Sequence, residues 1–189
     1  MRLHQPRIPP LTDAELTPEQ GELLAGITVA GPAANIFRTL AREPAALRGF
    51  LAWGNYVLSR RNGLPPRERE LAILRVGFLC KAGYEWAQHV RIGLAAGLTE
   101  AEVERIKAGP AAEGWREPDR ALLRAVDELH ADRFVSDVTW AELGRHFDDR
   151  QRMVIVFAVA QYTQVSMILN AFGVQLDDDL TLDPDLDGR

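Results

Sequence analysis

The chain has 189 residues, of which 47% are hydrophobic and 26% charged, values typical of one globular domain. That length can bury an apolar core without a disulfide or a structural metal. A formal net charge of −5, with no block of lysine or arginine, excludes the basic face that sequence-independent nucleic-acid binding requires.

The sequence shows neither a signal-peptide pattern nor a membrane-spanning segment. Residues 1–10 carry charges and three prolines where a signal peptide would have its apolar segment. The longest apolar run, residues 153–160, is too short to span a bilayer. Cys80 is the single cysteine, which excludes an intramolecular disulfide and a zinc ribbon. We therefore expect a cytoplasmic protein with neither a membrane nor a nucleic acid as partner.

In chain order, residues 1–12 with their three prolines predict an extended arm, and the recurring start signals that follow predict helices. Thr17-Pro18-Glu19-Gln20 offers an N-cap, a proline at the first helical position and a capping-box glutamine. The same spacing recurs at 99–102, 139–142 and 148–151, while Gly63, Gly97 and Gly173 are typical helix stops. The predicted helices are 17–27, 33–42, 44–61, 66–81, 84–97, 99–108, 118–132, 139–145 and 149–172.

Two of these segments, 71–79 and 153–160, are apolar nearly all round, which predicts that they lie in the interior or at a subunit interface. Residues 109–118 are the best candidate for a linker between two halves of one bundle. Residues 176–189 hold six aspartates and predict a solvated acidic tail. No segment alternates apolar and polar residues, so the fold class is all-α, one helical bundle over 1–189, and the similar starts of the two apolar helices suggest two similar halves.

A carboxylate and an imidazole stand four residues apart at Glu85 and His89, which puts them on one face of a helix. A carboxylate orients an imidazole and raises its basicity, as a general base near neutral pH requires. Glu70, near the start of the preceding helix, could fold back towards His89 because Gly83 lets the chain break between the two helices. An exposed ion pair of the same spacing is also common on helix surfaces, and Glu70 could equally be a favourable acid in a first turn.

Three runs carry a resemblance to a known family: Arg-Glu-Arg-Glu-Leu at 67–71, Tyr-Glu-Trp-Ala-Gln-His-Val at 84–90 and Ala-Ala-Gly-Leu-Thr at 95–99. Together they resemble the signature of the carboxymuconolactone decarboxylase family, which shares its fold with the alkylhydroperoxidase-D-like proteins. The resemblance is most specific over 65–105. It extends to 35–38 and 162–173, as in longer single-domain members, and implies an alkylhydroperoxidase-D-like helical bundle.

The peroxidase branch of that fold uses a Cys-x-x-Cys pair before the histidine, with an upstream glutamate. Those two cysteine positions fall on Ala82 and Glu85 here, and the upstream glutamate falls on Glu70. Cys80 lies two residues too early and has no partner. Peroxide reduction through a dithiol needs a peroxidatic and a resolving thiol, so the sequence argues against it.

The decarboxylase branch has a glutamate where this chain has Glu85, and it implies cofactor-free decarboxylation of a carboxylated lactone. In that reaction His89 would protonate the carbanion left by carbon dioxide, Glu85 would orient His89, and Glu70 would relay protons or position water. A dianionic substrate also needs an arginine clamp. The candidates for substrate binding are Arg75, Arg91, Tyr84, Trp86 and Tyr162, with Asn170 on the last helix as a further side chain near the site.

Three other readings stay open. A redox protein could use Cys80 as a lone thiol, although the apolar run before it favours a buried, inert one. Glu70, Glu85 and His89 could hold a metal, although no second histidine is near. The chain could also be a non-catalytic module. Under every reading its apolar helices predict a homo-oligomer, and the leading one predicts a small-molecule substrate and no cofactor.

Overall fold

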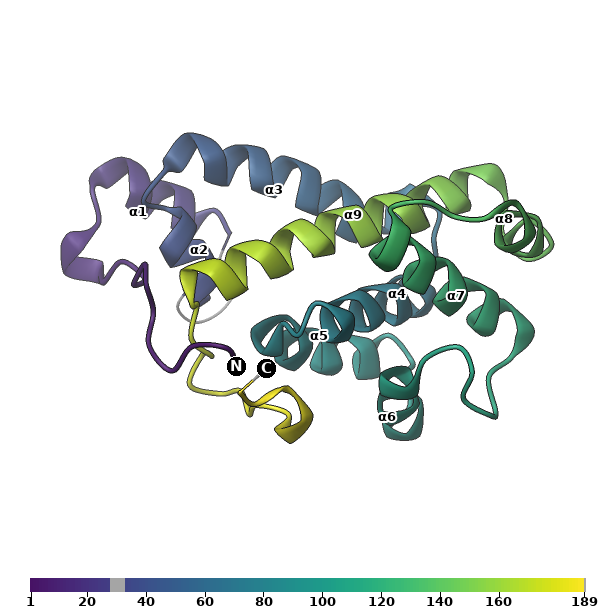
Figure 1. The fold of residues 1–189 in the computed structure, drawn as a ribbon. Helices are drawn as coiled ribbons and strands as arrows, with labels where there is room; N and C mark the ends of the chain where they lie inside the picture. Colours follow the sequence, from purple (N-terminus) through teal and green to yellow (C-terminus); the bar gives the residue numbers. More distant parts are fainter. Residues whose placement is uncertain (28–32, 189) are drawn as a thin grey trace.

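The structure is a computed structural model that describes residues 1–27 and 33–188; residues 28–32 and Arg189, the last residue of the predicted tail, lie outside the described residues. The described residues contain helices and turns but no strand, which confirms the predicted all-α class (Figure 1). Their helices are α1 (Pro18–Ala25), α2 (Asn35–Leu40), α3 (Pro44–Leu58), α4 (Pro66–Leu79), α5 (Gly83–Ala95), α6 (Glu100–Ala108), α7 (Glu117–Asp132), α8 (Asp137–Leu143) and α9 (Asp149–Phe172). Three short 3₁₀ helices lie at Asp13–Glu15, Arg60–Asn62 and Pro184–Leu186.

The helix starts follow the predicted capping chemistry, with one exception. Thr17, Thr99 and Asp148 each accept a hydrogen bond from the backbone N–H three residues later, in complete capping boxes. The spacing at 139–142 was wrong as a start signal, because α8 begins at Asp137 and Ser136 is its cap. Glu128 of α7 accepts hydrogen bonds from Ser136 and Thr139, so a tertiary contact decides which residue caps this helix.

The core lies around α4, which packs against α5, α7 and α9. Of the predicted apolar segment 71–79, residues 71–77 are buried, whereas Phe78 and Leu79 are partly buried; Arg69 and Glu70 are buried as well. Among the described helices, α9 is the one whose length and composition would also suit a membrane span, but it crosses the middle of the fold and half of its most apolar stretch is buried (Figure 1). Its apolar surface is therefore used as core.

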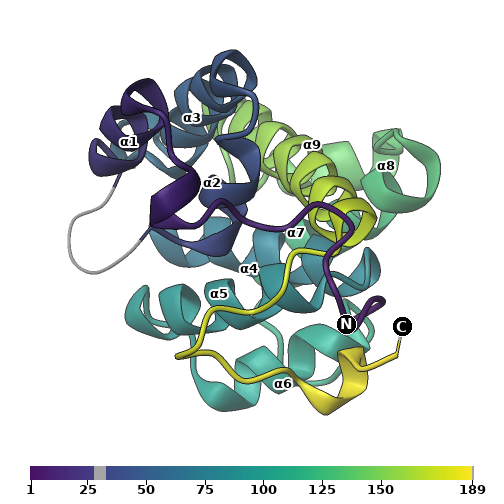
Figure 2. The same cartoon turned by 90° about the vertical axis from the view of Figure 1, so that its left-hand side faces the viewer.

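Both ends of the chain pack on the same side of the molecule, where they lie side by side (Figures 1 and 2). The Met1 ammonium donates to the Leu186 carbonyl at 2.7 Å, and the backbone N–H groups of Arg7 and Ile8 donate to the Phe172 carbonyl at the end of α9. The predicted arm at 1–12 is thus non-helical up to Thr12, and it lies on its own chain.

The acidic tail is not simply solvated, which corrects the sequence-based expectation. Asp177 accepts hydrogen bonds from the Tyr84 hydroxyl at 2.6 Å and from the Gln88 amide at 2.7 Å. Asp183 accepts from the Trp86 indole and forms an ion pair with Lys107. Regular spacing cannot reveal such contacts, because about ninety residues separate the partners in sequence.

The predicted linker at 109–118 is a packed turn. Trp115 is buried, donates from its indole to the Gly109 carbonyl at 3.0 Å and carries the Arg105 guanidinium over its ring. Gly109 has φ +81° and ψ −161°, a conformation that only glycine adopts readily. Its Cα faces the Arg75 guanidinium so closely that a Cβ there would lie 2.5 Å from Nη2.

Replacing Gly109 with alanine should therefore destabilise the protein through both backbone strain and the clash with Arg75. We expect Gly109→Ala to lower the free energy of unfolding by about 3 kcal/mol. Gly97→Ala is the matched control, since Gly97 also has positive φ but nothing within 4 Å of its Cβ position; it should lose about 1 kcal/mol. Urea unfolding followed by circular dichroism measures both, and equal losses would contradict the packing role of this turn.

Candidate active site

Two glycines let α4 and α5 approach closely enough for their polar side chains to meet. A Cβ on Gly77 of α4 would lie 3.3 Å from Cγ of Glu85, and a Cβ on Gly93 of α5 would lie 3.2 Å from Leu74 and 3.6 Å from the Cβ of Glu70. Because neither glycine carries a side chain, the two helices form a tight antiparallel pair across the turn at 80–82. Glu70 on α4 thereby faces Glu85 and His89 on α5.

The three side chains singled out from the sequence meet in the interior. Nδ1 of His89 lies 2.6 Å from Oε2 of Glu70, and Nε2 lies 3.1 Å from Oε1 of Glu85. A carboxylate can only accept, so the short contact places the Nδ1 proton between ring and carboxylate. The exposed fractions are 0% for Glu70, 3% for Glu85 and 6% for His89.

The two carboxylates have different surroundings. Glu70 accepts a further hydrogen bond from Nε of Arg69 at 3.2 Å, so both of its oxygens have partners. Oε1 of Glu85 is buried beside Nε2 of His89, yet it forms no hydrogen bond with the described residues. Glu70 therefore orients the ring, and Glu85 keeps an unsatisfied oxygen beside Nε2. This reverses the sequence-based assignment of Glu85 as the orienting residue.

Burial and charge together shift the proton affinity of the site. Burial raises the pKa of Glu85 to about 7, with the neighbouring Glu70 adding to the rise and His89 opposing it. Burial would lower the pKa of His89, but the two carboxylates outweigh it and the His89 pKa is raised. The site thus retains protons near neutral pH.

A cavity of about 230 Å³ opens against this cluster. Glu85 and His89 line it, whereas Glu70 lies behind His89 and does not. Tyr162 of α9 packs edge-on against the His89 ring, with ring centroids 4.8 Å apart, and also lines the cavity. The remaining walls come from α2, α3, α5 and α9 and are mainly apolar: Ala34, Ile36, Phe37, Phe50, Leu51, Leu58, Ile92 and Val165.

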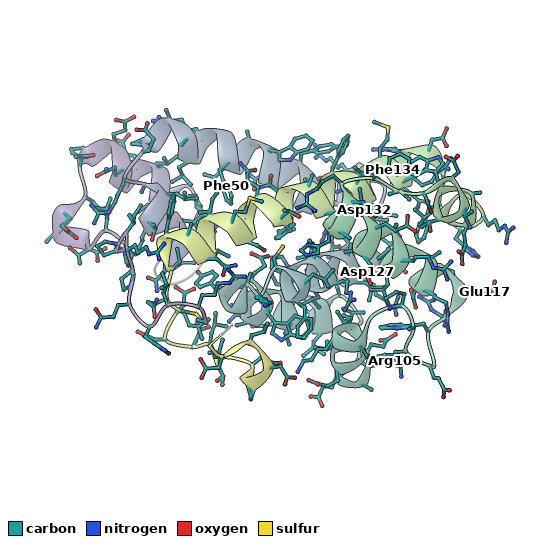
Figure 3. The ribbon with its side chains drawn as sticks, in the orientation of Figure 1. Phe50, Arg105, Glu117, Asp127, Asp132 and Phe134 are labelled. Atoms are coloured by element: carbon teal, nitrogen blue, oxygen red, sulfur yellow. The ribbon has the colours of Figure 1, made fainter. Side chains whose placement is uncertain are left out.

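Neither of the two predicted clamp arginines lines this cavity. Arg75 binds Asp127 of α7 through two hydrogen bonds, of 2.6 and 2.8 Å, and donates to the last carbonyls of α6 (Figure 3 labels Asp127). Arg91 forms an exposed ion pair with Asp179. Arg75 therefore ties α4 to α6 and α7, and its role as a substrate clamp has no support in this geometry.

The predicted aromatic residues divide between the cavity and the packing beneath the tail. Tyr84 lines the cavity, and its hydroxyl is held by Asp177. Trp86 does not line it: the indole donates to Asp183 and the ring packs against Phe78 at 5.4 Å. Asn170 also lies elsewhere, where its amide donates to the Cys80 carbonyl.

Cys80 opens to a different cavity, of about 430 Å³, which it shares with Arg2, Arg7, Ser166 and Asn170. Its thiol lies 3.7 Å from Nδ1 of His130, and burial raises its pKa. A raised pKa keeps the thiol protonated and slow to react. Ala82 and Glu85 supply no thiol beside His89, so the structure brings no sulfur to the cluster in the described part of the chain.

Sequence reasoning missed Arg69 and Gln161. Arg69 directly precedes Glu70 and could have been found as the adjacent cation, but consecutive helix residues ordinarily point in different directions. Gln161 lines the cavity from α9, and its only sequence signal is its position as a polar residue directly after the apolar run 153–160. Within the described residues, no three acidic, histidine or cysteine side chains are grouped so as to hold a metal ion.

Comparison with known proteins supports the resemblance read from the sequence. The model of the carboxymuconolactone decarboxylase family matches residues 44–128, from the start of α3 into α7. A comparison with curated proteins gave no match.

Several solved structures share the fold. The alkylhydroperoxidase AhpD core of a peroxidase-related protein from Ralstonia eutropha is 22% identical, with a TM-score of 0.81 over 94% of this chain and 95% of that one. A protein of unknown function from Agrobacterium tumefaciens is 24% identical, with a TM-score of 0.68 over 74% and 96%. A cysteine-to-alanine variant of the debrominase Bmp8, in complex with 2,3,4-tribromopyrrole, is 16% identical, with a TM-score of 0.74 over 93% and 94%.

The TM-scores establish a shared fold, and the low identities leave the chemistry open. The family match covers the helices that carry Glu70, Glu85 and His89. Residues 44–128 are therefore similar to the carboxymuconolactone decarboxylase family, and the chain has an alkylhydroperoxidase-D-like helical fold.

Proposed function

We propose that this protein is an enzyme that transfers protons at a carbon atom of a small ring compound, with His89 as the acid–base group. One observation carries the proposal: an imidazole held between two buried carboxylates stands at the wall of an otherwise apolar cavity. Burying three ionisable groups together is unfavourable unless they are well paired, so such clusters are found mainly at functional sites.

The roles follow from the contacts. Glu70 holds Nδ1 and is a positioning residue, because it does not reach the cavity. Nε2 and the unsatisfied Oε1 of Glu85 lie together at the cavity wall. Because the His89 pKa is raised, the ring carries a proton near neutral pH and can act as a general acid through Nε2. Glu85 can accept a proton from His89 or return one.

Decarboxylation of a carboxylated unsaturated lactone, the reaction that the family name describes, suits these groups. The bond to the carboxylate carbon breaks, carbon dioxide leaves, and the electron pair passes into the conjugated lactone carbonyl as a dienolate. Nε2 of His89 then gives its proton to the lactone ring carbon. The imidazole of His89 takes up a new proton from solvent or Glu85. No electron acceptor and no cofactor are needed. The neighbour that holds 2,3,4-tribromopyrrole is a further example of a small ring bound by this fold.

A homo-oligomer and a cytoplasmic location are part of the same proposal. Trp53 and Tyr56 of α3 stack with centroids 5.4 Å apart, and each is 41% exposed. Phe157 of α9 packs edge-on against Trp53. Such an aromatic cluster at the surface is typical of a subunit interface.

Replacing His89 should abolish turnover while leaving the fold intact. We expect wild-type protein to consume carboxymuconolactone, followed by loss of its ultraviolet absorbance, or to exchange ring protons of an uncharged butenolide for deuterium, followed by NMR. His89→Gln should lower the rate by about a hundredfold or more. Arg48→Gln, at an exposed ion pair with Glu19, is the control and should keep the wild-type rate. If wild-type protein performs neither reaction, the proposal fails.

Glu70→Gln tests positioning separately from chemistry. A glutamine can still contact Nδ1, but it removes the negative charge that helps to raise the His89 pKa. The limb of the rate–pH profile that reports loss of the His89 proton should therefore move to lower pH, with a fall of about tenfold in kcat at pH 7. A merely structural role would lower the rate at every pH without moving this limb.

The raised pKa of Glu85 predicts a pH-dependent stability. The folded state binds the Glu85 proton more tightly than the unfolded state, whose value is 4.5, so stability falls as pH rises from about 4.5 to about 7. His89 acts in the same direction, because its raised pKa favours the folded state only while the ring is protonated. The free energy of unfolding of Glu85→Gln, measured with urea, should therefore increase by about 2 kcal/mol relative to that of wild type as the pH rises from 5 to 8. A constant difference over that range would contradict the assignment.

A further inference from the structure

Gln161 carries an amide at the cavity that forms no hydrogen bond with any other described residue. The residue is 3% exposed, lies on α9 and lines the same cavity as Glu85 and His89. Within the described part of the chain its side chain forms no hydrogen bond, and its amide atoms are not among the fully buried unpaired ones, so they remain accessible from the cavity. An amide beside a cavity with an unpaired donor and an unpaired acceptor can hydrogen-bond to a ligand in that cavity.

Gly54 keeps the space in front of that amide open. It lies within α3, where glycine destabilises a helix relative to alanine. A Cβ at Gly54 would lie 3.9 Å from Nε2 of Gln161, an ordinary contact that would fill the space without a clash. Both residues line the cavity, so an alanine at position 54 would occupy room beside the amide.

The remaining lining restricts the charge of the occupant. No lysine or arginine is among the described residues that line the cavity, and its ionisable members are Glu85, His89 and two tyrosines. Arg69 does not line the cavity: its Nε donates to Glu70, and its Nη1 is buried without a partner among the described residues. A dicarboxylate would bring two further negative charges to a low-dielectric site beside Glu85, where protonated His89 is the one cation among the described lining residues and no arginine supplies a bidentate clamp.

The size of the cavity restricts the occupant further. Its volume is about 230 Å³, compared with the roughly 150 Å³ of an apolar cavity that binds benzene. One six-membered ring with a few further atoms fits this volume. Phe37 and Phe50 supply aromatic walls for such a ring (Figure 3 labels Phe50 on α3).

We infer that Gln161 is the specificity-determining residue of this cavity, and that its ligand is an uncharged single-ring compound whose edge offers both a hydrogen-bond donor and an acceptor. The Gln161 amide pairs with that edge while the ring packs on the apolar walls and reaches Nε2 of His89. The inference rests on the proposed function for the cavity's identity as the active site, and it replaces the carboxylated lactone with a neutral ring as the preferred substrate class.

Binding of three probes to the purified full chain tests this without any turnover. 2-Pyridone is neutral and has the donor–acceptor edge, benzene has the ring alone, and phthalate has the ring with two carboxylates. Measured by calorimetry or ligand-observed NMR at pH 7, 2-pyridone should bind at least about tenfold more tightly than phthalate and more tightly than benzene.

Three variants separate recognition from folding. Gln161→Met conserves side-chain volume. It should weaken the binding of 2-pyridone on the order of tenfold while leaving benzene binding unchanged. Gly54→Ala should weaken the binding of both 2-pyridone and benzene. It should also raise the melting temperature by about 3 °C, because alanine favours the helix. Gly49→Ala is the matched control: it lies on the same helix with nothing within 4 Å of its Cβ position, and it should raise the melting temperature without changing binding.

Equal binding of phthalate and 2-pyridone, or unchanged 2-pyridone binding by Gln161→Met, would overturn the inference. Its failure is distinguishable from failure of the proposed function. Selective 2-pyridone binding without turnover of any lactone would keep the recognition site and remove the proton-transfer role. Turnover that depends on His89, together with 2-pyridone binding that is unchanged by Gln161→Met, would keep the proton-transfer role and remove the recognition site.

Discussion

A buried contact between Glu70 and His89 joins the two central helices of this protein, and much of the structure serves to make that contact possible. A carboxylate with no solvent exposure is strongly unfavourable unless it is paired and hydrogen-bonded. His89 and Arg69 provide that pairing, one on each oxygen of Glu70. The glycines at 77 and 93 let α4 and α5 come close enough for the pairing to form. Tyr162 on α9 closes the remaining side of the imidazole.

The same arrangement explains why the chemistry is directed into the cavity. Nδ1 of His89 is occupied by Glu70, so Nε2 is the ring atom that remains for a ligand, and the unsatisfied oxygen of Glu85 lies beside it. The cavity walls are mainly apolar, which strengthens electrostatic interactions at the cluster because apolar surroundings have a low dielectric constant. An acid–base group with a retained proton, next to an apolar space the size of one ring, is the arrangement that proton transfer at carbon requires.

Two arginines of α4 pair with acids outside the cavity, which bears on the charge of the ligand. Arg75 joins α4 to α7 and to the end of α6, and Arg67 bridges Asp119 and Glu102 on the same side of the bundle. These are structural pairs between helices. Two polar groups at the cavity form no hydrogen bond within the described residues: the neutral Gln161 amide and Oε1 of Glu85. A neutral ring with a hydrogen-bonding edge therefore suits this cavity better than a dianion does.

Local sequence determined much of this protein. Helix positions were predicted to within a few residues, because caps such as Thr17, Thr99 and Asp148 act on the backbone three residues away. The pairing of Glu85 with His89 could be predicted for the same reason, since i,i+4 residues share a helix face. Tertiary structure alone decided which carboxylate contacts Nδ1 of the imidazole, that Arg75 binds Asp127, that Asp177 binds the Tyr84 hydroxyl, and that Gln161 lines the same cavity as His89. The partners in these pairs are separated by 19 to more than 90 residues, and spacing carries no signal at such distances because the contact depends on how whole helices pack.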